Sequence, residues 1–177
     1  MGSFNFNAEL STLLFGGQYK ELAKGDYLLR EGAVERNVYL IGSGAVRAYI
    51  LSDVEEITIR FGYEGSVINS LASFISGQAS ELSLQAIRKT SCYTIDKQAL
   101  EAFVNQSAAH QKGYTTLLEQ TIVQQIERET DLLTASPAER LARVLKRSPN
   151  LFQQVPLKYI ASYLRMTPET LSRIRKS

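Results

Sequence analysis

The sequence predicts an α+β chain in which a small antiparallel β barrel or jelly roll is followed by a long helix and a basic helical tail. Three observations support this expectation. Short apolar segments bounded by glycines fill residues 20–96, a stretch without proline covers residues 97–133, and residues 136–177 hold nine of the 20 Lys and Arg residues. Frequent strands with glycine at their corners are typical of small barrels and jelly rolls. We expect three units, in residues 1–108, 109–135 and 136–177.

The predicted strands lie in the first unit. DYLLREG ends at Gly32, and EEITIRFGYEG alternates Ile57, Ile59 and Phe61 with polar residues, the period of a half-buried strand. NVYLIGSGAVRAYIL contains two strands, and glycines 42 and 44 between them predict a hairpin. LSLQAIRKTSCYTID (residues 82–96) continues the pattern.

Residues from about 97 to 133 are expected to be helical, with Gly113 as the one glycine. Apolar residues recur there at spacings of three and four, while Gln and Glu fill the other faces. A long helix with a narrow apolar stripe is typical of a helix that lies against another helix. We therefore expect a homodimer helix in residues 109–135, with the contact residues Tyr114, Leu117, Leu118, Thr121, Ile122 and Gln125. The alternative is a single helix folded back on its own barrel.

Composition excludes several classes of site. The chain has 177 residues, 44% hydrophobic and 21% charged, an ordinary globular composition. Cys92 is the single cysteine and His110 the single histidine, so we expect neither an internal disulfide nor a zinc or haem site in the usual ligand sets. No Ser-His-Asp arrangement, Cys-His pair or phosphate-binding glycine loop is evident. We therefore expect no metal, no cofactor and no catalytic residue.

Two features bear on location. No apolar run approaches the ~20 residues that a helix needs to span a bilayer. MGSFNFNAELST lacks the basic start and apolar stretch of a signal peptide. We therefore expect a cytoplasmic protein without membrane contacts.

Charge is unevenly distributed along the chain. Residues 136–177 carry nine basic and two acidic side chains, a net charge of +7, whereas residues 1–135 carry 11 basic and 16 acidic side chains, a net charge of −5. A compact basic end on an acidic body is typical of a module that binds a polyanion. A solvated basic surface is the alternative.

The basic end is predicted to be helical. Ser136, Pro137 and Glu139 form a helix start with a cap, a first-position proline and a capping-box acid. A second helix is expected to begin near Pro156, and Thr167-Pro168-Glu169 to open a third.

The last two of these helices are expected to form a helix-turn-helix. Leu171 and Ile174 face back toward Ala161 and leave a polar, cationic outer face. Arg can donate to guanine, Glu can accept from cytosine, and Lys and Arg attract phosphates. We expect double-stranded DNA as the partner, with these contact residues: Lys158, Thr167, Glu169, Thr170, Ser172, Arg173, Arg175 and Lys176.

The chain resembles the cyclic-AMP receptor protein superfamily of bacterial transcription regulators (Crp/Fnr type) over nearly its whole length. The segments that carry the resemblance are GDYLLREGAVERNVYLIGSGAVRAYIL, YEGSVINSLASFISGQASELSLQAI and VPLKYIASYLRMTPETLSRIRK. The first is similar to the family's jelly roll, the second occupies the place of its phosphate-binding cassette, and the third is similar to its helix-turn-helix. The resemblance implies a β-roll sensor domain in residues 1–108, a dimerisation helix in 109–135 and a DNA-binding domain in 136–177.

The cassette departs from the family's pattern. Where the resemblance implies an early Gly-Glu pair and a late Arg-Ser or Arg-Ala pair, this sequence has Asn69-Ser70 and Ser80-Glu81. The cation that would pair with the cyclic phosphate is absent, and Glu81 would place a negative charge there. We therefore expect that the protein does not bind cAMP and that an effector, if it has one, is a different small molecule that contacts Asn69, Ser70, Ser80 and Glu81.

The recognition helix also differs from the family. The base-contacting positions correspond to Pro168, Glu169 and Arg173, and Arg165 stands at a turn position usually held by glycine. A left-handed conformation there would cost about 1 kcal/mol for a residue with a side chain. Family members continue beyond this helix, whereas the sequence ends at Ser177, so we expect a short recognition helix and modest DNA affinity.

The leading hypothesis is thus a homodimeric, sequence-specific DNA-binding transcription regulator without enzymatic activity. Two alternatives remain. One is a cupin-like barrel that binds a small ligand and whose helical tail is structural. The other is a degenerate regulator that keeps the dimer and has lost ligand control.

Overall fold

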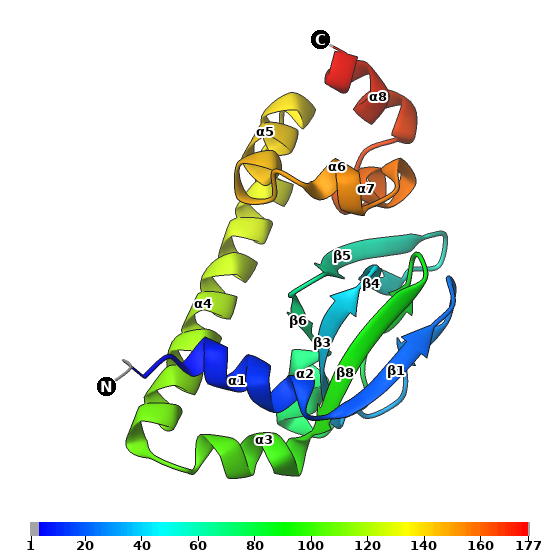
Figure 1. The fold of residues 1–177 in the computed structure, drawn as a ribbon. Coiled ribbons are helices and arrows are strands. Elements are labelled where there is room, and N and C mark those ends of the chain that lie inside the picture. The colour runs from blue at the N-terminus through cyan, green and yellow to red at the C-terminus, as the bar shows by residue number, and fades with distance from the viewer. Residues whose placement is uncertain (1–3, 177) are drawn as a thin grey trace.

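The chain folds into a β roll, a long helix and a helical tail, shown in Figure 1 as a computed structural model that describes residues 4–176. The expected end of the recognition helix at Ser177 lies outside the described residues. The strands are β1 (Gln18–Leu22), β2 (Tyr27–Leu29), β3 (Asn37–Ser43), β4 (Ala45–Leu51), β5 (Glu56–Tyr63), β6 (Val67–Ile68), β7 (Ser83–Ala86) and β8 (Thr90–Asp96). The helices are α1 (Phe6–Phe15), α2 (Leu71–Ser76), α3 (Lys97–Val104), α4 (Ala108–Leu133), α5 (Pro137–Arg147), α6 (Leu151–Gln154), α7 (Leu157–Tyr163) and α8 (Pro168–Lys176).

The β roll consists of two four-stranded antiparallel sheets with the strand orders β1-β8-β3-β6 and β2-β7-β4-β5. Two four-stranded sheets built from eight strands are the layout of a jelly roll. Side chains of both sheets form one core, which includes Tyr39, Ile41, Val46, Leu84 and Cys92. The jelly roll is thus the observed form of the two β architectures that the strand pattern allowed.

The predicted hairpin at glycines 42 and 44 is wrong, because β3 and β4 belong to different sheets. Gly44 has a φ of 83°, and a Cβ there would lie 2.2 Å from the carbonyl oxygen of Lys89. The turn therefore carries the chain from one sheet to the other and packs directly against the loop between β7 and β8. A local glycine pattern identifies the turn but not the partner of each strand.

The regular alternation predicted for residues 57–61 is interrupted. Ala48 pairs with Arg60 and Tyr49 pairs with Thr58, which leaves Ile59 as an extra residue in β5. Such a bulge shifts the side-chain alternation along a strand. Ile59 packs against the core of the roll, whereas Phe61 packs against the helical tail.

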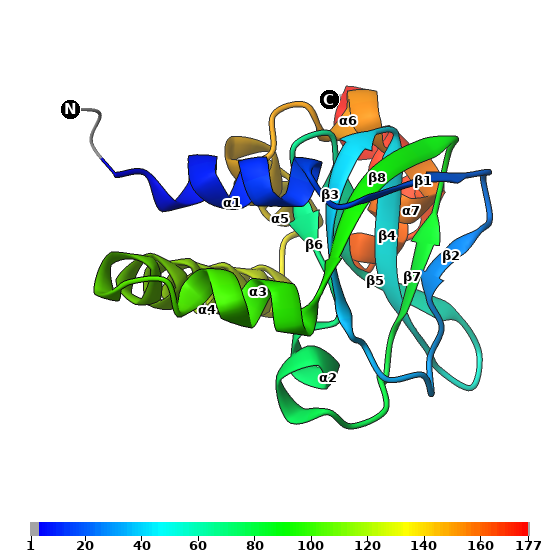
Figure 2. The same cartoon turned by 60° about the horizontal axis from the view of Figure 1, so that its bottom comes forward.

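The region from about residue 97 to 133 is helical, as expected, but residues 105–107 divide it into two helices, α3 and α4. Asn105 ends α3, and Ser107 caps α4 by accepting a hydrogen bond from the N–H of His110 at 3.3 Å. In the view of Figure 2, α1, α3 and α4 lie together on one side of the two sheets. Their cluster includes Phe6, Leu14 and Phe103. The long helix α4 thus starts one residue before its predicted start at residue 109 and ends two residues before its predicted end at residue 135.

The tail packs around Leu141, Ile160, Leu164 and Leu171, in a cluster that also contains Ala45 and Ile87 of the roll, and Ile174 packs against it. The predicted cap of α5 is confirmed, since the Ser136 hydroxyl accepts from the N–H of Glu139 at 3.3 Å. In Figure 1, α7 lies over β5 and α8 is the helix farthest from the roll. Among the described residues, no helix has the length and apolar character needed to cross a bilayer.

Candidate nucleic-acid interface and ligand sites

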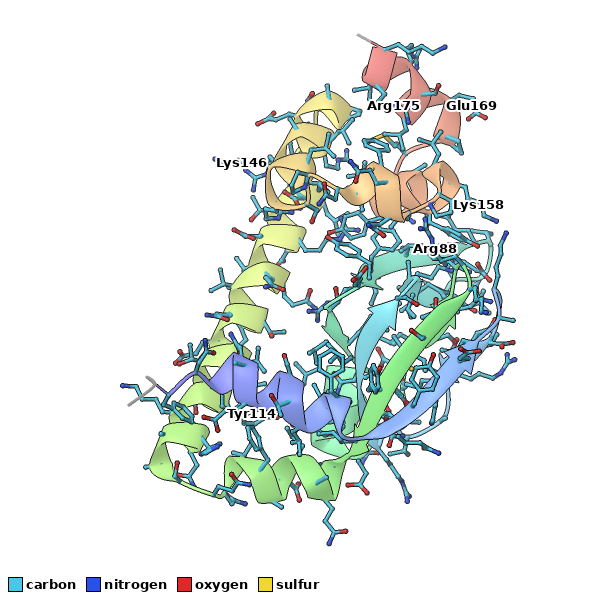
Figure 3. The ribbon with its side chains drawn as sticks, viewed as in Figure 1. Arg88, Tyr114, Lys146, Lys158, Glu169 and Arg175 are labelled. Atoms are coloured by element: carbon cyan, nitrogen blue, oxygen red, sulfur yellow. The ribbon has the colours of Figure 1, made fainter. Side chains whose placement is uncertain are left out.

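The outer face of α8 carries the side chains predicted to contact DNA. Glu169, Arg173, Arg175 and Lys176 are exposed, while Leu171 on the opposite face is completely buried. Figure 3 shows Glu169 on the outer side of α8 and Lys158 at the outer end of α7. The remaining predicted residues on this helix, Thr170 and Ser172, are half-buried.

Two of the predicted contact residues have structural roles as well. The hydroxyl of Thr167 accepts from the N–H of Thr170 at 3.1 Å and therefore caps α8. The guanidinium of Arg175 lies 5.1 Å from the ring centroid of Phe152 in α6. A cation at this distance is attracted by the face of the ring. Arg175 thus binds α8 to α6 in addition to contributing positive charge at the helix end.

The turn between α7 and α8 is built around Arg165, whose φ is 52°. The N–H of Met166 donates to the carbonyl of Ala161 at 3.0 Å, and the N–H of Arg165 donates to the carbonyl of Ser162 at 3.1 Å. These are the two hydrogen bonds of a Schellman motif, which usually has glycine at the left-handed position. The left-handed conformation considered from the sequence is therefore present at Arg165.

The tail is bound to the edge strand β5 through Ser162. The Ser162 hydroxyl accepts from the N–H of Thr58 at 2.9 Å and donates to the carbonyl of Glu56 at 3.0 Å. An exposed ion pair of 2.9 Å joins Arg165 to Glu55 in the preceding loop. The position of α7, and with it of α8, is thus fixed by the β roll.

A second joint connects the long helix to the tail. Asp131 of α4 is completely buried and accepts from Arg143 at 2.8 Å and from Arg147. Burial by itself would raise the pKa of Asp131, but the hydrogen bonds from Arg147 and Arg143 outweigh it and hold the pKa below its ordinary value. The carboxylate therefore stays charged and fixes α5 against the end of α4.

The structure divides the residues predicted for the dimer helix. Tyr114 and Leu117 pack against the cluster formed by α1 and α3 of the same chain. Ile122 is 58% exposed, and Gln125 is exposed beside it. Leu118 and Thr121 are half-buried. Thus one part of the predicted stripe packs on its own roll, as the alternative interpretation had it, and the other part is open to solvent.

The cassette is closed by its own polar groups. The hydroxyls of Ser70 and Ser80 are hydrogen-bonded to each other at 2.8 Å, and both residues are buried. Glu35 is also buried, and its carboxylate accepts from the N–H of Asn37 and from the hydroxyl of Tyr39. Burial raises the pKa of Glu35, which these hydrogen bonds partly oppose. An acidic group therefore lies inside this region, where the sequence had suggested only Glu81.

The four residues predicted to contact an effector do not share one cavity. Glu81 is exposed, so the negative charge expected within the cassette lies at the surface. Asn69 is half-buried and lines a cavity of about 360 Å³ between the roll and α4, together with Tyr114, Leu118 and Thr121. Ser70 and Ser80 do not line this cavity. Across residues 4–176, no group of three or more His, Cys, Asp or Glu side chains is arranged to hold a metal ion.

The comparisons with known proteins agree with this geometry. Residues 19–107 match the sequence model of the family described as "Cyclic nucleotide-binding domain". The chain belongs to this family. A search of curated proteins gave no match.

Several solved structures of transcription regulators share the fold of this cyclic nucleotide-binding domain protein. FixK2 from Bradyrhizobium japonicum has a TM-score of 0.77 at 22% sequence identity, over 90% of this chain and 82% of that one. The c-di-GMP-responsive global regulator CLP of Xanthomonas campestris has a TM-score of 0.69 at 14% identity, over 96% and 89%. A CRP-family transcriptional regulator from Thermus thermophilus, TTHB099, has a TM-score of 0.65 at 18% identity, over 89% and 82%. At these identities the likeness establishes the fold.

Sequence reasoning did not identify the residues that join the parts of the molecule. Ser162 and Asp131 had no distinguishing local pattern, because each makes its contacts with residues far away in the sequence or on another element. Arg60 is a different case, because it lines three cavities beside α4 and the sequence pattern placed it only among the polar residues of an alternating strand. An arginine among Ile, Phe and Thr in a short strand is unusual, and that is the one signal that singles it out.

Proposed function

We propose that the chain is a homodimeric, sequence-specific DNA-binding transcription regulator that is not controlled by cAMP. The observation that carries this proposal is α8, a helix with a buried apolar face and an exposed polar and cationic face. It stands at the end of the tail farthest from the β roll (Figure 1). The regulators that share the fold support the same assignment.

The proposed roles follow from side-chain chemistry. Glu169 and Arg173 lie one helical turn apart on the outer face and are assigned to base edges in the major groove. Hydroxyl and cationic groups around them are assigned to DNA phosphates. Contacts to phosphates position the helix on the duplex but do not distinguish one base sequence from another. The residues assigned to phosphates are Lys158, Thr167, Thr170, Ser172, Arg175 and Lys176. The proposal assigns no catalytic role to any residue.

A second copy of the chain is the proposed partner of α4. Ile122, Val123 and Ile126 are between 56% and 58% exposed, and Leu133 is 79% exposed. Exposed apolar residues clustered on one side of a long helix are typical of a surface that another helix covers. In such a dimer, two copies of α8 about 34 Å apart would read half-sites one DNA turn apart.

The DNA assignment is tested by selecting bound fragments from random genomic DNA and measuring their affinity by electrophoretic mobility shift. We expect the double variant Glu169→Ala/Arg173→Ala to lose at least tenfold in affinity, since a good base contact contributes about 1–3 kcal/mol. The matched control is Lys24→Ala/Glu31→Ala, which removes one cation and one anion from exposed positions on the roll. Equal affinity of all three proteins would favour the alternative in which the tail is structural.

The cAMP prediction is tested separately by isothermal titration calorimetry. The hydrogen-bonded pair Ser70–Ser80 and the buried Glu35 replace the cation that an anionic cyclic phosphate requires. We expect no saturable heat with cAMP up to millimolar concentrations. A micromolar dissociation constant would overturn this part of the proposal and leave the DNA assignment untouched.

A further inference from the structure

A cavity of about 620 Å³ lies between the roll, α4 and the tail. It is lined by β5, β6, α4, α5, α6 and α7, so the roll, the long helix and the tail all contribute to its walls. Ligand sites commonly have volumes of about 300–1,000 Å³ and combine apolar walls with a few polar groups. This cavity fits that description, with Phe61 and Tyr163 among its walls.

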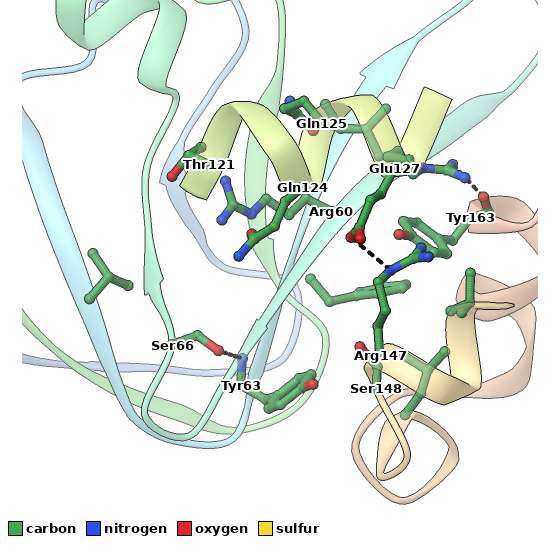
Figure 4. Close-up of a pocket in the computed structure, with 16 residues that line it drawn as sticks. Arg60, Tyr63, Ser66, Thr121, Gln124, Gln125, Glu127, Arg147, Ser148 and Tyr163 are labelled. Carbon is green, nitrogen blue, oxygen red and sulfur yellow. Dashed lines mark hydrogen bonds and ion pairs between the residues drawn. The ribbon is translucent and has the colours of Figure 1, made fainter. Parts of the chain in front are cut away.

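Arg60 is the unusual residue of this cavity. It lies on β5, is only partly accessible to solvent, and also lines the two smaller cavities of about 360 and 320 Å³ along α4. Its backbone pairs with β4, but no hydrogen bond or ion pair joins its side chain to any residue in the range 4–176. In Figure 4 its side chain extends beside Gln124 and Thr121 of α4. A half-buried guanidinium without a protein counter-charge is unfavourable by itself.

A second guanidinium in the same cavity also has an unused donor. Arg128 is 9% exposed, lies 3.8 Å above the ring of Tyr163 and donates through Nη2 to the carbonyl of that residue. Its Nη1 is buried and has no hydrogen-bond partner within the part of the chain that the structure describes. Burial lowers the pKa of both Arg60 and Arg128 below the ordinary arginine value. An anionic group beside either guanidinium would offset that cost.

The charges around the cavity favour an anion. Three arginines line it, Arg60, Arg128 and Arg147, against one acid, Glu127. Glu127 and the nearby Asp131 both form ion pairs with Arg147, whereas neither Arg60 nor Arg128 forms an ion pair among the described residues, although Asp131 attracts Arg128 at longer range. Arginine can donate two parallel hydrogen bonds to a carboxylate or a phosphate.

We propose that this cavity is an effector site for a small organic anion, whose phosphate or carboxylate group binds Arg60 and whose body packs against Tyr163 and Phe61. Gln124, Gln125 and Ser148 supply further hydrogen-bonding groups. The site lies outside the cassette, whose interior holds Glu35. Because its walls come from both the roll and the tail, its occupant would set how the two are packed. The inference goes beyond the DNA assignment and does not depend on it.

The test is calorimetric titration of the full chain, without DNA, using phenyl phosphate and benzoate as anionic probes and benzamide as the neutral counterpart. We expect at least one anionic probe to bind the wild type saturably and benzamide not to bind. Arg60→Gln should raise the dissociation constant at least tenfold. Arg36→Gln, which removes an exposed guanidinium from the roll, should leave it unchanged. The probe that binds more tightly, phenyl phosphate or benzoate, shows whether the natural ligand carries a phosphate or a carboxylate group.

Folding of the variant is checked by thermal unfolding. Since Arg60 forms no ion pair with any residue between 4 and 176, we expect Arg60→Gln to unfold at the same or a higher temperature than the wild type. Arg60→Lys keeps the positive charge but loses the bidentate guanidinium donor, so it should bind the probe with an affinity between those of the wild type and Arg60→Gln. A crystal structure with the bound probe should place its anionic group about 3 Å from Arg60.

Three results would overturn the proposal. The first is equal probe affinity of the wild type and Arg60→Gln. The second is the absence of saturable binding by either anionic probe at millimolar concentration. The third is weaker self-association of Arg60→Gln in sedimentation equilibrium with probe affinity unchanged, which would make Arg60 a contact to an acidic group of a second copy. DNA binding enters none of these measurements, so the two proposals fail independently.

Discussion

Arg165 combines an unfavourable backbone conformation with favourable contacts. Its φ of 52° is the one positive value among the non-glycine residues of the described chain. The conformation costs about 1 kcal/mol for a residue with a Cβ. An exposed ion pair such as that with Glu55 returns about 0–1 kcal/mol. The two effects are of similar size, so the residue is close to neutral for stability, and it orients α8 through its backbone.

Replacing Arg165 separates these two effects. Arg165→Gly and Arg165→Ala both remove the ion pair, but only glycine relieves the left-handed conformation. We expect the glycine variant to exceed the alanine variant in free energy of unfolding by about 1 kcal/mol in urea titrations. Equal stabilities would show that the turn relaxes to another conformation when the side chain is shortened.

At the scale of elements, α1 crosses α4 at Gly113. A Cβ at this position would lie 2.4 Å from Cγ of Phe6, closer than nonbonded atoms approach each other. The glycine therefore permits direct contact between the two helices. Without it, α1 would move away from the cluster that contains Phe6, Leu10 and Phe103.

We therefore expect Gly113→Ala to be destabilising although alanine is the better helix former. The gain in helix propensity is at most about 1 kcal/mol, whereas overpacking costs about 1–3 kcal/mol. The net loss in free energy of unfolding should be about 1 kcal/mol in urea titrations. Lys112→Ala, on the exposed neighbouring position, is the control and should be neutral. A stabilised Gly113→Ala variant would mean that α1 does not pack closely on α4 in solution.

Local signals in the sequence predicted the elements better than their partners. Ser136 and Thr167 were identified as caps because capping is decided within four residues. The break between α3 and α4 was missed although Ser107 is a good cap, since the helical pattern continues across it. Glycines 42 and 44 were interpreted as a hairpin, because pairing between distant strands leaves no local trace.

The same limit applies to the candidate sites. The outer face of α8 followed from helical spacing, which is a local property. The cavity around Arg60 is formed by six elements from different parts of the chain, and no single segment contains its pattern. The split of the α4 stripe between the chain's own roll and solvent likewise depends on where α1 and α3 pack.

At the scale of the whole molecule, the ion pairs of Asp131 with Arg143 and Arg147 make the folded chain less stable at acid pH. The pKa of Asp131 is lowered in the folded chain relative to its ordinary value of 3.8. The stabilisation is therefore present above about pH 3.8 and is lost as the pH falls through the lower pKa of the folded state.

We expect Asp131→Asn to lose about 2 kcal/mol of unfolding free energy at pH 7, because two arginines lose their buried carboxylate partner. Below pH 3 the difference between variant and wild type should shrink. Urea titrations at pH 7, 4 and 2.5 would measure this, with Asp53→Asn on an exposed loop as the control. A difference that stays constant with pH would show that the charge of Asp131 is not what stabilises the joint.

The contact of Ser162 with β5 has a consequence for any rearrangement of the tail. β5 is the outermost strand of its sheet, and open strand edges readily pair with other chains. The tail shields part of that edge by occupying the amide of Thr58 and the carbonyl of Glu56. Movement of α7 away from β5 would expose unpaired backbone groups at the strand edge and would also reposition α8. A fragment that ends after α4 should therefore self-associate through β5.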